Sequence, residues 1–255
     1  MHVHSSRNQR WLSNAYLVAD PISRKAALID SGAPMAPLLA VIESEGYQVE
    51  RVLLTHHHPD HVQHNREWQE RFRVPLCGHP AERELFGHLD IELQHEQSFA
   101  VGELRVQALH VPGHTLGQLN FLVEGKSEGR ATACVFTGDT LFRGSVGGTR
   151  GKGHTTLADL KHSILHILLA LPEDLTVYPG HMEPTSIGEE LKNNPFVRYW
   201  RGETEEDGGQ VRAYEREAIL LVDALDYDGG RKCQLRFTDD QSEDLVPGSK
   251  VTRLD

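Results

Sequence analysis

The sequence contains few cysteines, and their positions suggest neither a disulfide nor a thiolate metal site. The three cysteines, Cys77, Cys134 and Cys233, lie far apart and form no C-x-x-C pair. Cys134 falls within an apolar run and is expected to pack as a small hydrophobic residue. We therefore expect reduced, buried thiols, which excludes a scaffold held together by disulfides.

Long apolar runs are also absent. No stretch approaches the roughly 20 apolar residues that a helix needs to cross a bilayer. Residues 1–6 lack the basic region and the following apolar stretch of a secretory signal. These features predict a cytoplasmic protein without a membrane partner.

Basic residues are in deficit. The chain has 26 lysines and arginines against 37 aspartates and glutamates, which gives a formal net charge of -11. Binding to a nucleic acid backbone depends on clustered basic side chains that displace counterions. The sequence has no such cluster, so it predicts no nucleic acid partner.

The chain is long enough for one large domain with a small one attached. Residues 1–201 are predicted to form the large domain, and the acidic, glycine-rich residues 202–217 a linker. Residues 218–255 are predicted to form a small all-β module. Polar and apolar residues alternate over 232–237, which predicts that only one face of this module is buried, either within a miniature barrel or against the large domain. No chemistry is predicted for it.

Within the large domain, short apolar runs alternate with amphipathic segments, a pattern typical of strands and helices in one α/β domain. Strands are predicted at 15–19, 26–30, 49–54, 104–109, 119–123, 131–137 and 175–178. Helices are predicted at 34–46, 65–72, 156–168 and 186–194. Several of the strands run directly into short turns that carry histidine or aspartate.

The first of these turns, 55–61, has the spacing H-x-H-x-D-H. Imidazole and carboxylate groups together suit zinc, iron or manganese, and Pro59 stiffens the turn so that its side chains can converge. The alternative is a polar, histidine-rich loop without a metal. The candidate metal ligands of this turn are His56, His58, Asp60 and His61.

Three later strand ends each supply one further candidate. They are His114 after strand 104–109, Asp139 after 131–137, and His181 after 175–178. Catalytic zinc commonly takes three protein ligands and keeps a position open for water. Seven candidates therefore fit two metal ions that share one bridging carboxylate.

These motifs resemble those of metallo-β-lactamase-fold hydrolases, and above all those of the glyoxalase II (hydroxyacylglutathione hydrolase) branch. The resemblance extends over residues 11–200. It implies an α/β protein with a four-layer αββα sandwich and with the metals at one edge between the two sheets. The segments that carry it are 55–61, 112–117, 136–142, 179–181 and 194–196.

The resemblance also implies a role for each candidate ligand. It assigns His56, His58 and His114 to one metal, Asp60, His61 and His181 to the other, and Asp139 to a bridge between them. The expected cofactors are two divalent ions, zinc in the first place and iron or manganese as alternatives. Asp60 is also expected to act in catalysis.

The implied reaction is hydrolysis of a small-molecule thioester by a hydroxide that bridges the two metals. A thiolate leaves readily because its conjugate acid has a pKa of about 8.5. Alternatives in the same superfamily are a mononuclear iron persulfide dioxygenase and a lactonase or β-lactamase. Gly180 and His181 count against the dioxygenase, whose members usually lack that glycine and do not use that histidine. A binding protein with structural metals is a further alternative, and a homodimer is one arrangement that the sequence leaves open.

The other histidines are expected to lie mostly on the surface. His57 should point away from the metals, and His64 is a candidate for the shell of groups around the ligands. His162 and His166, four residues apart on a predicted helix, should lie on its exposed face. The basic residues that could hold a substrate carboxylate are Arg150, Lys152, Arg198 and Arg201.

Overall fold

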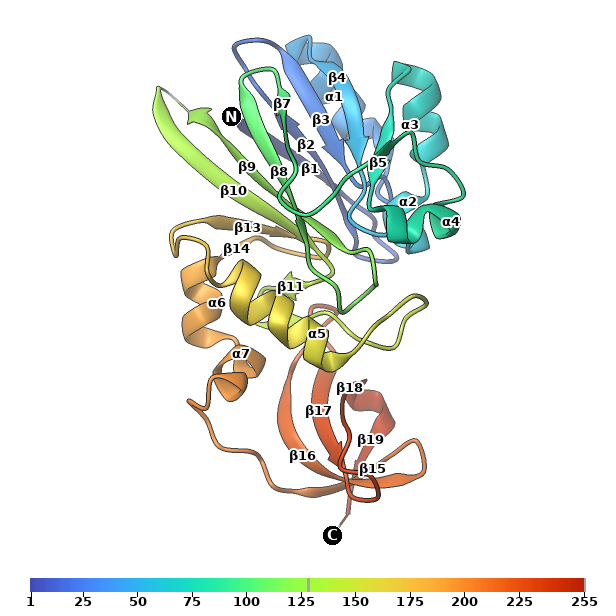
Figure 1. Cartoon of the computed structure of the whole chain (residues 1–255), viewed down its shortest axis with the longest axis vertical. Helices are drawn as coiled ribbons and strands as arrows, with labels where there is room; N and C mark the ends of the chain where they lie inside the picture. Colours follow the sequence, from blue (N-terminus) through green and yellow to red (C-terminus); the bar gives the residue numbers. More distant parts are fainter. Residues whose placement is uncertain (128, 255) are drawn as a thin grey trace.

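The computed structural model of the chain describes residues 1–127 and 129–254. Two six-stranded sheets face each other, and helices cover the outer face of each sheet (Figure 1). Buried apolar side chains form one cluster between the two sheets and one between each sheet and its helices. This is the four-layer αββα arrangement that the sequence predicted. A third, five-stranded sheet lies at the C-terminal end.

The first sheet is mixed, with antiparallel pairing from β1 to β3 and parallel pairing from β3 to β6. Parallel strands need helical crossovers, which here cover the outer face. The strands are β1 (His2–Arg7), β2 (Asn14–Ala19), β3 (Lys25–Ile29), β4 (Gln48–Leu53), β5 (Leu76–Gly78) and β6 (Ile91–Glu92).

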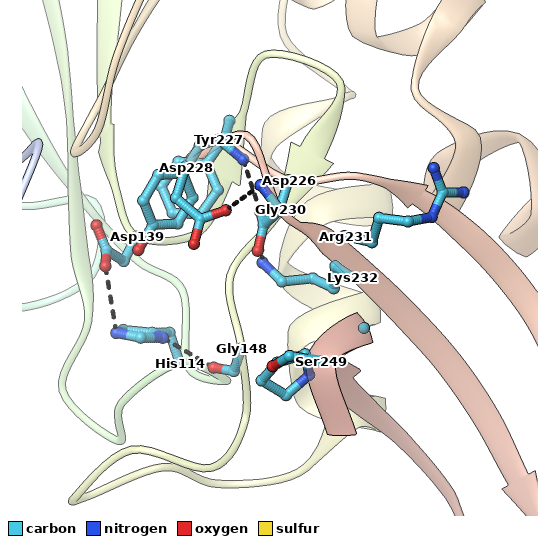
Figure 2. Close-up of a pocket in the computed structure, with 13 residues that line it drawn as sticks. His114, Asp139, Gly148, Asp226, Tyr227, Asp228, Gly230, Arg231, Lys232 and Ser249 are labelled. Atoms are coloured by element: carbon cyan, nitrogen blue, oxygen red, sulfur yellow. Dashed lines mark hydrogen bonds and ion pairs between the residues drawn. The ribbon is translucent and has the colours of Figure 1, made fainter. Parts of the chain in front are cut away.

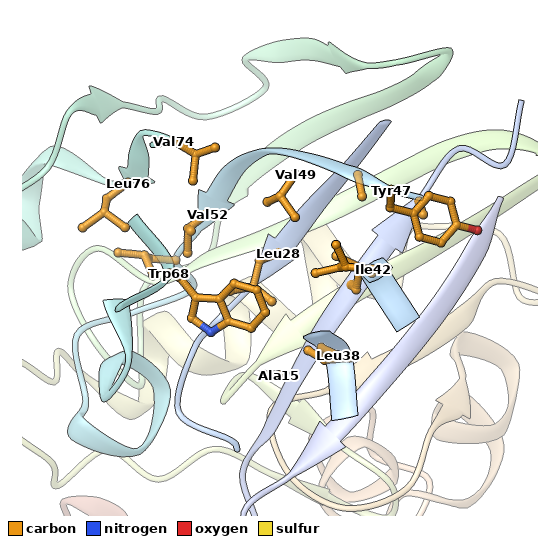
Figure 3. Packing of buried hydrophobic residues seen from close by; sticks show 14 of the residues in the cluster. Ala15, Leu28, Leu38, Ile42, Tyr47, Val49, Val52, Trp68, Val74 and Leu76 are labelled. Carbon is orange, nitrogen blue, oxygen red and sulfur yellow. The ribbon is translucent and has the colours of Figure 1, made fainter. Parts of the chain in front are cut away.

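The helices on this sheet bury one apolar side each. Helix α1 (Met35–Glu45) turns Leu38 and Ile42 inward and ends at Gly46, whose left-handed backbone suits glycine. Helix α3 (Asn65–Phe72) buries Trp68, which Figure 3 shows beside the strand residues Leu28 and Val52. The remaining short segments are α2 (Pro59–Val62), a 3₁₀ turn (Pro80–Glu82) and α4 (Arg83–Phe86).

The second sheet is antiparallel except for the parallel pair β10 and β13. Its strands, in spatial order, are β14 (Thr185–Ser186), β13 (Thr176–Pro179), β10 (Arg130–Gly138), β9 (Leu119–Ser127), β8 (Leu104–His110) and β7 (Ser98–Val101). A separate two-stranded ribbon consists of β11 (Leu141–Phe142) and β12 (Ser145–Val146).

The outer helices of the second sheet begin at capping residues that can be recognised in the sequence. Thr156 and Asp159 form a capping box at the start of α5 (Leu157–His162), which continues into a π-helical segment (Ser163–Leu168). Ser186 caps α6 (Ile187–Asn193), and Asn194 caps α7 (Pro195–Trp200). None of the helices in the described part of the chain is both long and apolar enough to cross a membrane.

The C-terminal sheet begins earlier than predicted. Strand β15 (Gln210–Ala213) lies inside the segment 202–217 that was predicted as a linker, so the connection is limited to residues 202–209. The strand is short, and its two buried residues, Val211 and Ala213, give too weak a periodic signal for prediction. The other strands are β16 (Arg216–Leu225), β17 (Arg231–Phe237), β18 (Glu243–Pro247) and β19 (Val251–Arg253), with a 3₁₀ turn (Gly248–Lys250) before β19.

The prediction that only one face of this sheet is buried is also wrong. One face forms its own apolar cluster, while Leu221 and Leu245 join the cluster under helices α5 to α7. The polar residues on that face are satisfied by the large domain. Gln234 accepts a hydrogen bond from the Trp200 indole at 2.7 Å, and the buried Lys232 ammonium donates to the backbone carbonyl of Val146. The sheet is therefore packed against the large domain.

Candidate metal centre

The structure brings all seven predicted ligand residues together at one edge of the sandwich. His56 and His58 follow β4, and Asp60 and His61 lie in the first turn of α2. The other three arrive from the second sheet, each just beyond the end of a strand. These are His114 after β8, Asp139 after β10 and His181 after β13.

Three histidines form the first group of converging side chains. His114 Nε2 lies 2.9 Å from His58 Nδ1, and the His56 ring centroid is 4.7 Å from that of His58. Their ligand atoms all lie within 4.8 Å of one another. The buried His56 Nε2 finds no hydrogen-bond partner among the described residues, which is costly for a polar atom unless it binds something else.

The second group contains Asp60, His61 and His181, whose ligand atoms likewise lie within 4.8 Å of one another. His181 Nε2 is 3.4 Å from His61 Nε2 and 3.4 Å from Asp60 Oδ2. His61 Nε2 is 3.5 Å from Asp60 Oδ2. Two ring nitrogens and a carboxylate oxygen therefore face a common point.

Asp139 lies between the two groups. Its Oδ1 is 3.2 Å from His61 Nε2, and its Oδ2 is 3.3 Å from His181 Nε2 and 3.5 Å from His114 Nε2. Figure 2 shows His114 between Asp139 and Gly148. One carboxylate thus reaches atoms of both groups, which is the position that a bridging ligand requires.

The electrostatics of the centre favour a cation. Burial lowers the pKa of His114 to about 4 and also lowers the pKa of His58, so both rings are neutral at pH 7. Burial also opposes charge on His181, but the Asp139 carboxylate outweighs it and raises the His181 pKa to about 9. Neutral imidazoles beside carboxylates that stabilise positive charge suit divalent metal ions, which compete with protons for the same nitrogens. The residues present therefore fit metal binding.

The second nitrogen of several rings is held by the surrounding protein. His58 Nε2 lies 3.0 Å from the carbonyl oxygen of Lys152, and His114 Nδ1 lies 2.8 Å from that of Gly148. His61 Nδ1 lies 2.9 Å from the carboxylate of the buried Asp30. An N–H that donates to such an acceptor leaves the opposite nitrogen free to face the centre.

Asp30 was not singled out from the sequence. It ends the predicted strand 26–30, and its carboxylate also accepts hydrogen bonds from the Thr55 backbone N–H at 2.8 Å and hydroxyl at 2.7 Å. Its backbone has a left-handed φ of 56°, which is uncommon outside glycine. The only sequence signal was a carboxylate directly after a buried strand.

The remaining histidines match the predictions in part. The His57 ring points away from the centre, as predicted, but it is buried and pairs with the Glu82 carboxylate at 2.8 Å. Glu82 also accepts a hydrogen bond from the Gly117 N–H, so it ties two ligand loops together. His64 lies 3.6 Å from Glu67 and makes no ring contact with the ligands among the described residues. His162 and His166 are both exposed, as predicted.

Gly180 is required by the close approach of the loops. A Cβ at this position would lie 2.3 Å from Asp139 Oδ1 and 2.8 Å from the Gly138 carbonyl. The loop that carries His181 is fixed from the other sheet as well, because Asn14 and Tyr16 both donate hydrogen bonds to the Pro179 carbonyl. The His181 ring is thus held close to the Asp139 carboxylate.

A cleft of about 620 Å³ opens beside the centre. Its inner wall includes His114 and Asp139, and its outer wall comes from the C-terminal sheet, including Tyr227 and Lys232 (Figure 2). The C-terminal module, for which the sequence indicated no role, therefore lines the cleft. Its local sequence does not signal this position, because the contacts join residues far apart in the chain, such as Lys232 and Val146, which are 86 positions apart.

Three of the four basic residues that could hold a substrate carboxylate pair with carboxylates outside the cleft. Arg150 pairs with Asp244 at 2.6 Å, and Arg198 and Arg201 both pair with Glu203. Lys152 contributes its backbone carbonyl to His58. None of these four side chains lines the cleft within the described residues.

Comparison with known proteins gives a consistent result. A model of the metallo-beta-lactamase superfamily matches residues 9–181, a range that holds all seven candidate ligand residues. A hydroxyacylglutathione hydrolase of Mesorhizobium japonicum is 29% identical over 242 residues, which cover 81% of this chain and 91% of that protein.

Two solved structures share the fold and part of the sequence. TTHA1623 in a di-iron-bound form is 32% identical with a TM-score of 0.62, covering 76% of this chain and 99% of its own. ETHE1 from Myxococcus xanthus is 27% identical with a TM-score of 0.64, covering 77% of this chain and 84% of its own. The chain belongs to the metallo-beta-lactamase superfamily, whose members are generally hydrolytic metalloenzymes.

Proposed function

We propose that this chain is a dinuclear metallohydrolase that cleaves a small-molecule thioester. The observation that carries the proposal is the position of Asp139, whose two oxygens lie 3.2–3.5 Å from ring nitrogens of both ligand groups. The first ion would be held by His56, His58 and His114, the second by Asp60, His61 and His181, and Asp139 would contact both. Zinc suits this set of imidazole and carboxylate donors, and iron and manganese also accept it.

Divalent ions in this position would acidify a water molecule and polarise the acyl carbonyl of the substrate. The protein's own contribution begins with Asp60. The surrounding His181 and His61 side chains outweigh burial and hold the Asp60 pKa below its usual range, so the group is a carboxylate at neutral pH. Its side chain is 22% exposed, against 9% for Asp139, so solvent reaches it. Asp60 can therefore orient the attacking water and accept its proton.

A thioester is the acyl substrate that this centre suits best. A thiolate leaves without prior protonation at neutral pH because its conjugate acid has a pKa of about 8.5, so no separate acid is needed on the leaving-group side. The similarity to a hydroxyacylglutathione hydrolase supports the same class of substrate. The position of His181, 3.3 Å from Asp139 Oδ2, supports a second ion and disfavours the single-iron dioxygenase.

Metal content and hydrolysis together test the proposal. Protein purified without added metal should carry close to two ions per chain by elemental analysis and should hydrolyse S-lactoylglutathione. Asp139→Ala should lose both properties, because it removes the carboxylate common to the two groups. Asp174→Ala, which changes an exposed carboxylate outside the centre, is the matched control. A single tightly bound iron, together with oxygen consumption on a persulfide, would refute the proposal.

A further inference from the structure

The C-terminal sheet supplies a wall of the cleft that the family resemblance does not explain. The family match ends at residue 181, whereas the cleft is also lined by the turn between β16 and β17 and by Pro247 to Ser249. Figure 2 shows Tyr227 and Asp228 of that turn on the side of the cleft facing Asp139. A part of the chain outside the matched domain therefore faces the centre directly.

Tyr227 of this turn contacts one of the candidate ligands. Its ring stacks on that of His181 with centroids 4.3 Å apart and an interplanar angle of 25°, and it lies 4.8 Å from the Phe142 ring. The side chain is only half-buried and lines the cleft. Among the described residues, Tyr227 hydrogen-bonds only through its backbone N–H, which leaves the hydroxyl as a free donor beside the cleft.

The turn that carries Tyr227 is fixed by a buried polar network. Asp226 Oδ1 accepts hydrogen bonds from the Ser145 hydroxyl at 2.8 Å, the Lys232 ammonium at 3.0 Å and the Tyr227 backbone N–H at 2.9 Å. Lys232 also donates to the Val146 carbonyl. The network joins the C-terminal sheet to the ribbon that follows Asp139, so the tyrosine is held in place without help from a ligand.

We propose that Tyr227 is a substrate-contact residue, whose hydroxyl donates a hydrogen bond to the acyl group being hydrolysed. The inference rests on the proposed function, because it takes the ligand in the cleft to be an acyl compound. When water adds to the acyl carbon, the carbonyl oxygen gains negative charge, and a fixed donor next to it stabilises that charge. The ring remains stacked on His181 and makes one side of the acyl site. The C-terminal sheet is thus part of the site that selects the substrate.

A role in packing alone predicts a different mutational pattern. Tyr227→Phe keeps the ring, its stacking on His181 and its contact with Phe142, and removes only the hydroxyl. If Tyr227 merely covered the cleft, this variant would behave as wild type. The matched control is Tyr214→Phe, which removes a hydroxyl from the same sheet at a residue that does not line the cleft.

Steady-state hydrolysis of S-lactoylglutathione by the metal-loaded proteins is the first measurement. Tyr227→Phe should lower kcat/KM about tenfold or more, since a hydrogen bond to a charged group commonly contributes a tenfold factor or greater. The fall should lie in kcat rather than in KM, because the oxygen carries its charge only in the transition state. Tyr214→Phe should remain at the wild-type value, and metal content should be equal in all three proteins.

Binding of acetohydroxamate, a small carbonyl-bearing chelator, is the second measurement and does not depend on turnover. Calorimetry should show about threefold to tenfold weaker binding to Tyr227→Phe than to wild type. If wild type hydrolyses no thioester, the proposed function fails, and acetohydroxamate binding that depends on the hydroxyl would then support only a contact between Tyr227 and a carbonyl ligand in the cleft. If Tyr227→Phe matches wild type in both measurements, the inference is overturned while the proposed function is untouched.

Discussion

Replacing Asp30 with asparagine should weaken the second metal site and leave the first intact. In the native protein the Asp30 carboxylate accepts a hydrogen bond from His61 Nδ1, which points His61 Nε2 at the centre. An amide of the same shape presents an NH₂ group that can donate to Nδ1. His61 would then carry its proton on Nε2, the nitrogen that must be bare to bind a metal.

The size of the effect follows from the contacts. The bond at 2.9 Å joins a buried ring to a buried carboxylate, and a hydrogen bond to a charged partner contributes about 1.5–3 kcal/mol. Converted to affinity, this corresponds to roughly a 10- to 100-fold weaker second ion, the range usual for groups that orient a metal ligand. The amide oxygen still accepts the Thr55 backbone N–H, so the turn should fold, which thermal unfolding can verify.

The assay is a zinc titration of metal-free protein against a chromogenic chelator. Wild type should show two binding steps, and Asp30→Asn should keep the first and weaken the second. His64→Ala is the control, because His64 lies close in sequence but its ring faces Glu67. A second dissociation constant in Asp30→Asn within about threefold of wild type would contradict the proposed role of Asp30.

Three further predictions follow from single contacts. Gly180→Ala should lower metal content because its Cβ would lie 2.3 Å from the Asp139 carboxylate, whereas Gly148→Ala, whose Cβ meets open space, should not. Burial and the stacked His110 ring lower the pKa of His79 in the folded protein to about 4. As pH falls below 6.5, His79 is therefore protonated in the unfolded chain before it is protonated in the folded one, and this favours unfolding. Between pH 7 and pH 5, wild type should therefore lose more unfolding free energy in urea than His79→Gln. Asp228→Asn removes a carboxylate from the cleft wall, so kcat/KM for anionic S-lactoylglutathione should rise about two- to threefold at low ionic strength, with no change for an uncharged thioester.

The candidate ligand residues could be predicted from the sequence because each follows closely on the end of a strand, four of them after the same one. A strand followed by a tight turn is a local pattern, and His114, Asp139 and His181 each lie just beyond such a strand. The helix caps at Thr156 and Ser186 are local in the same way. These features need only a few neighbouring residues to specify them.

The groups that support the ligands could not be predicted with the same certainty. Asp30 is 31 residues from His61, and Glu82 is 25 residues from His57, so neither pair shares a local motif. A carboxylate at the end of a strand is common in loops, and only its partner gives it a role. The partner is decided by which strands pair, and pairing depends on contacts across the whole sheet.

The sequence by itself determined the seven candidate ligand residues and the helix caps, because short local motifs specify them, and the resemblance carried by those motifs predicted the αββα class. Only the tertiary structure decided that the C-terminal sheet closes the cleft and that Tyr227 lies on His181. The physical reason is that Lys232 and Gln234 alternate with apolar residues, the pattern of a strand with one face exposed to solvent. Both side chains are nevertheless buried against the large domain. Their burial is stabilised by partners such as Val146 and Trp200, which become neighbours only when the chain folds.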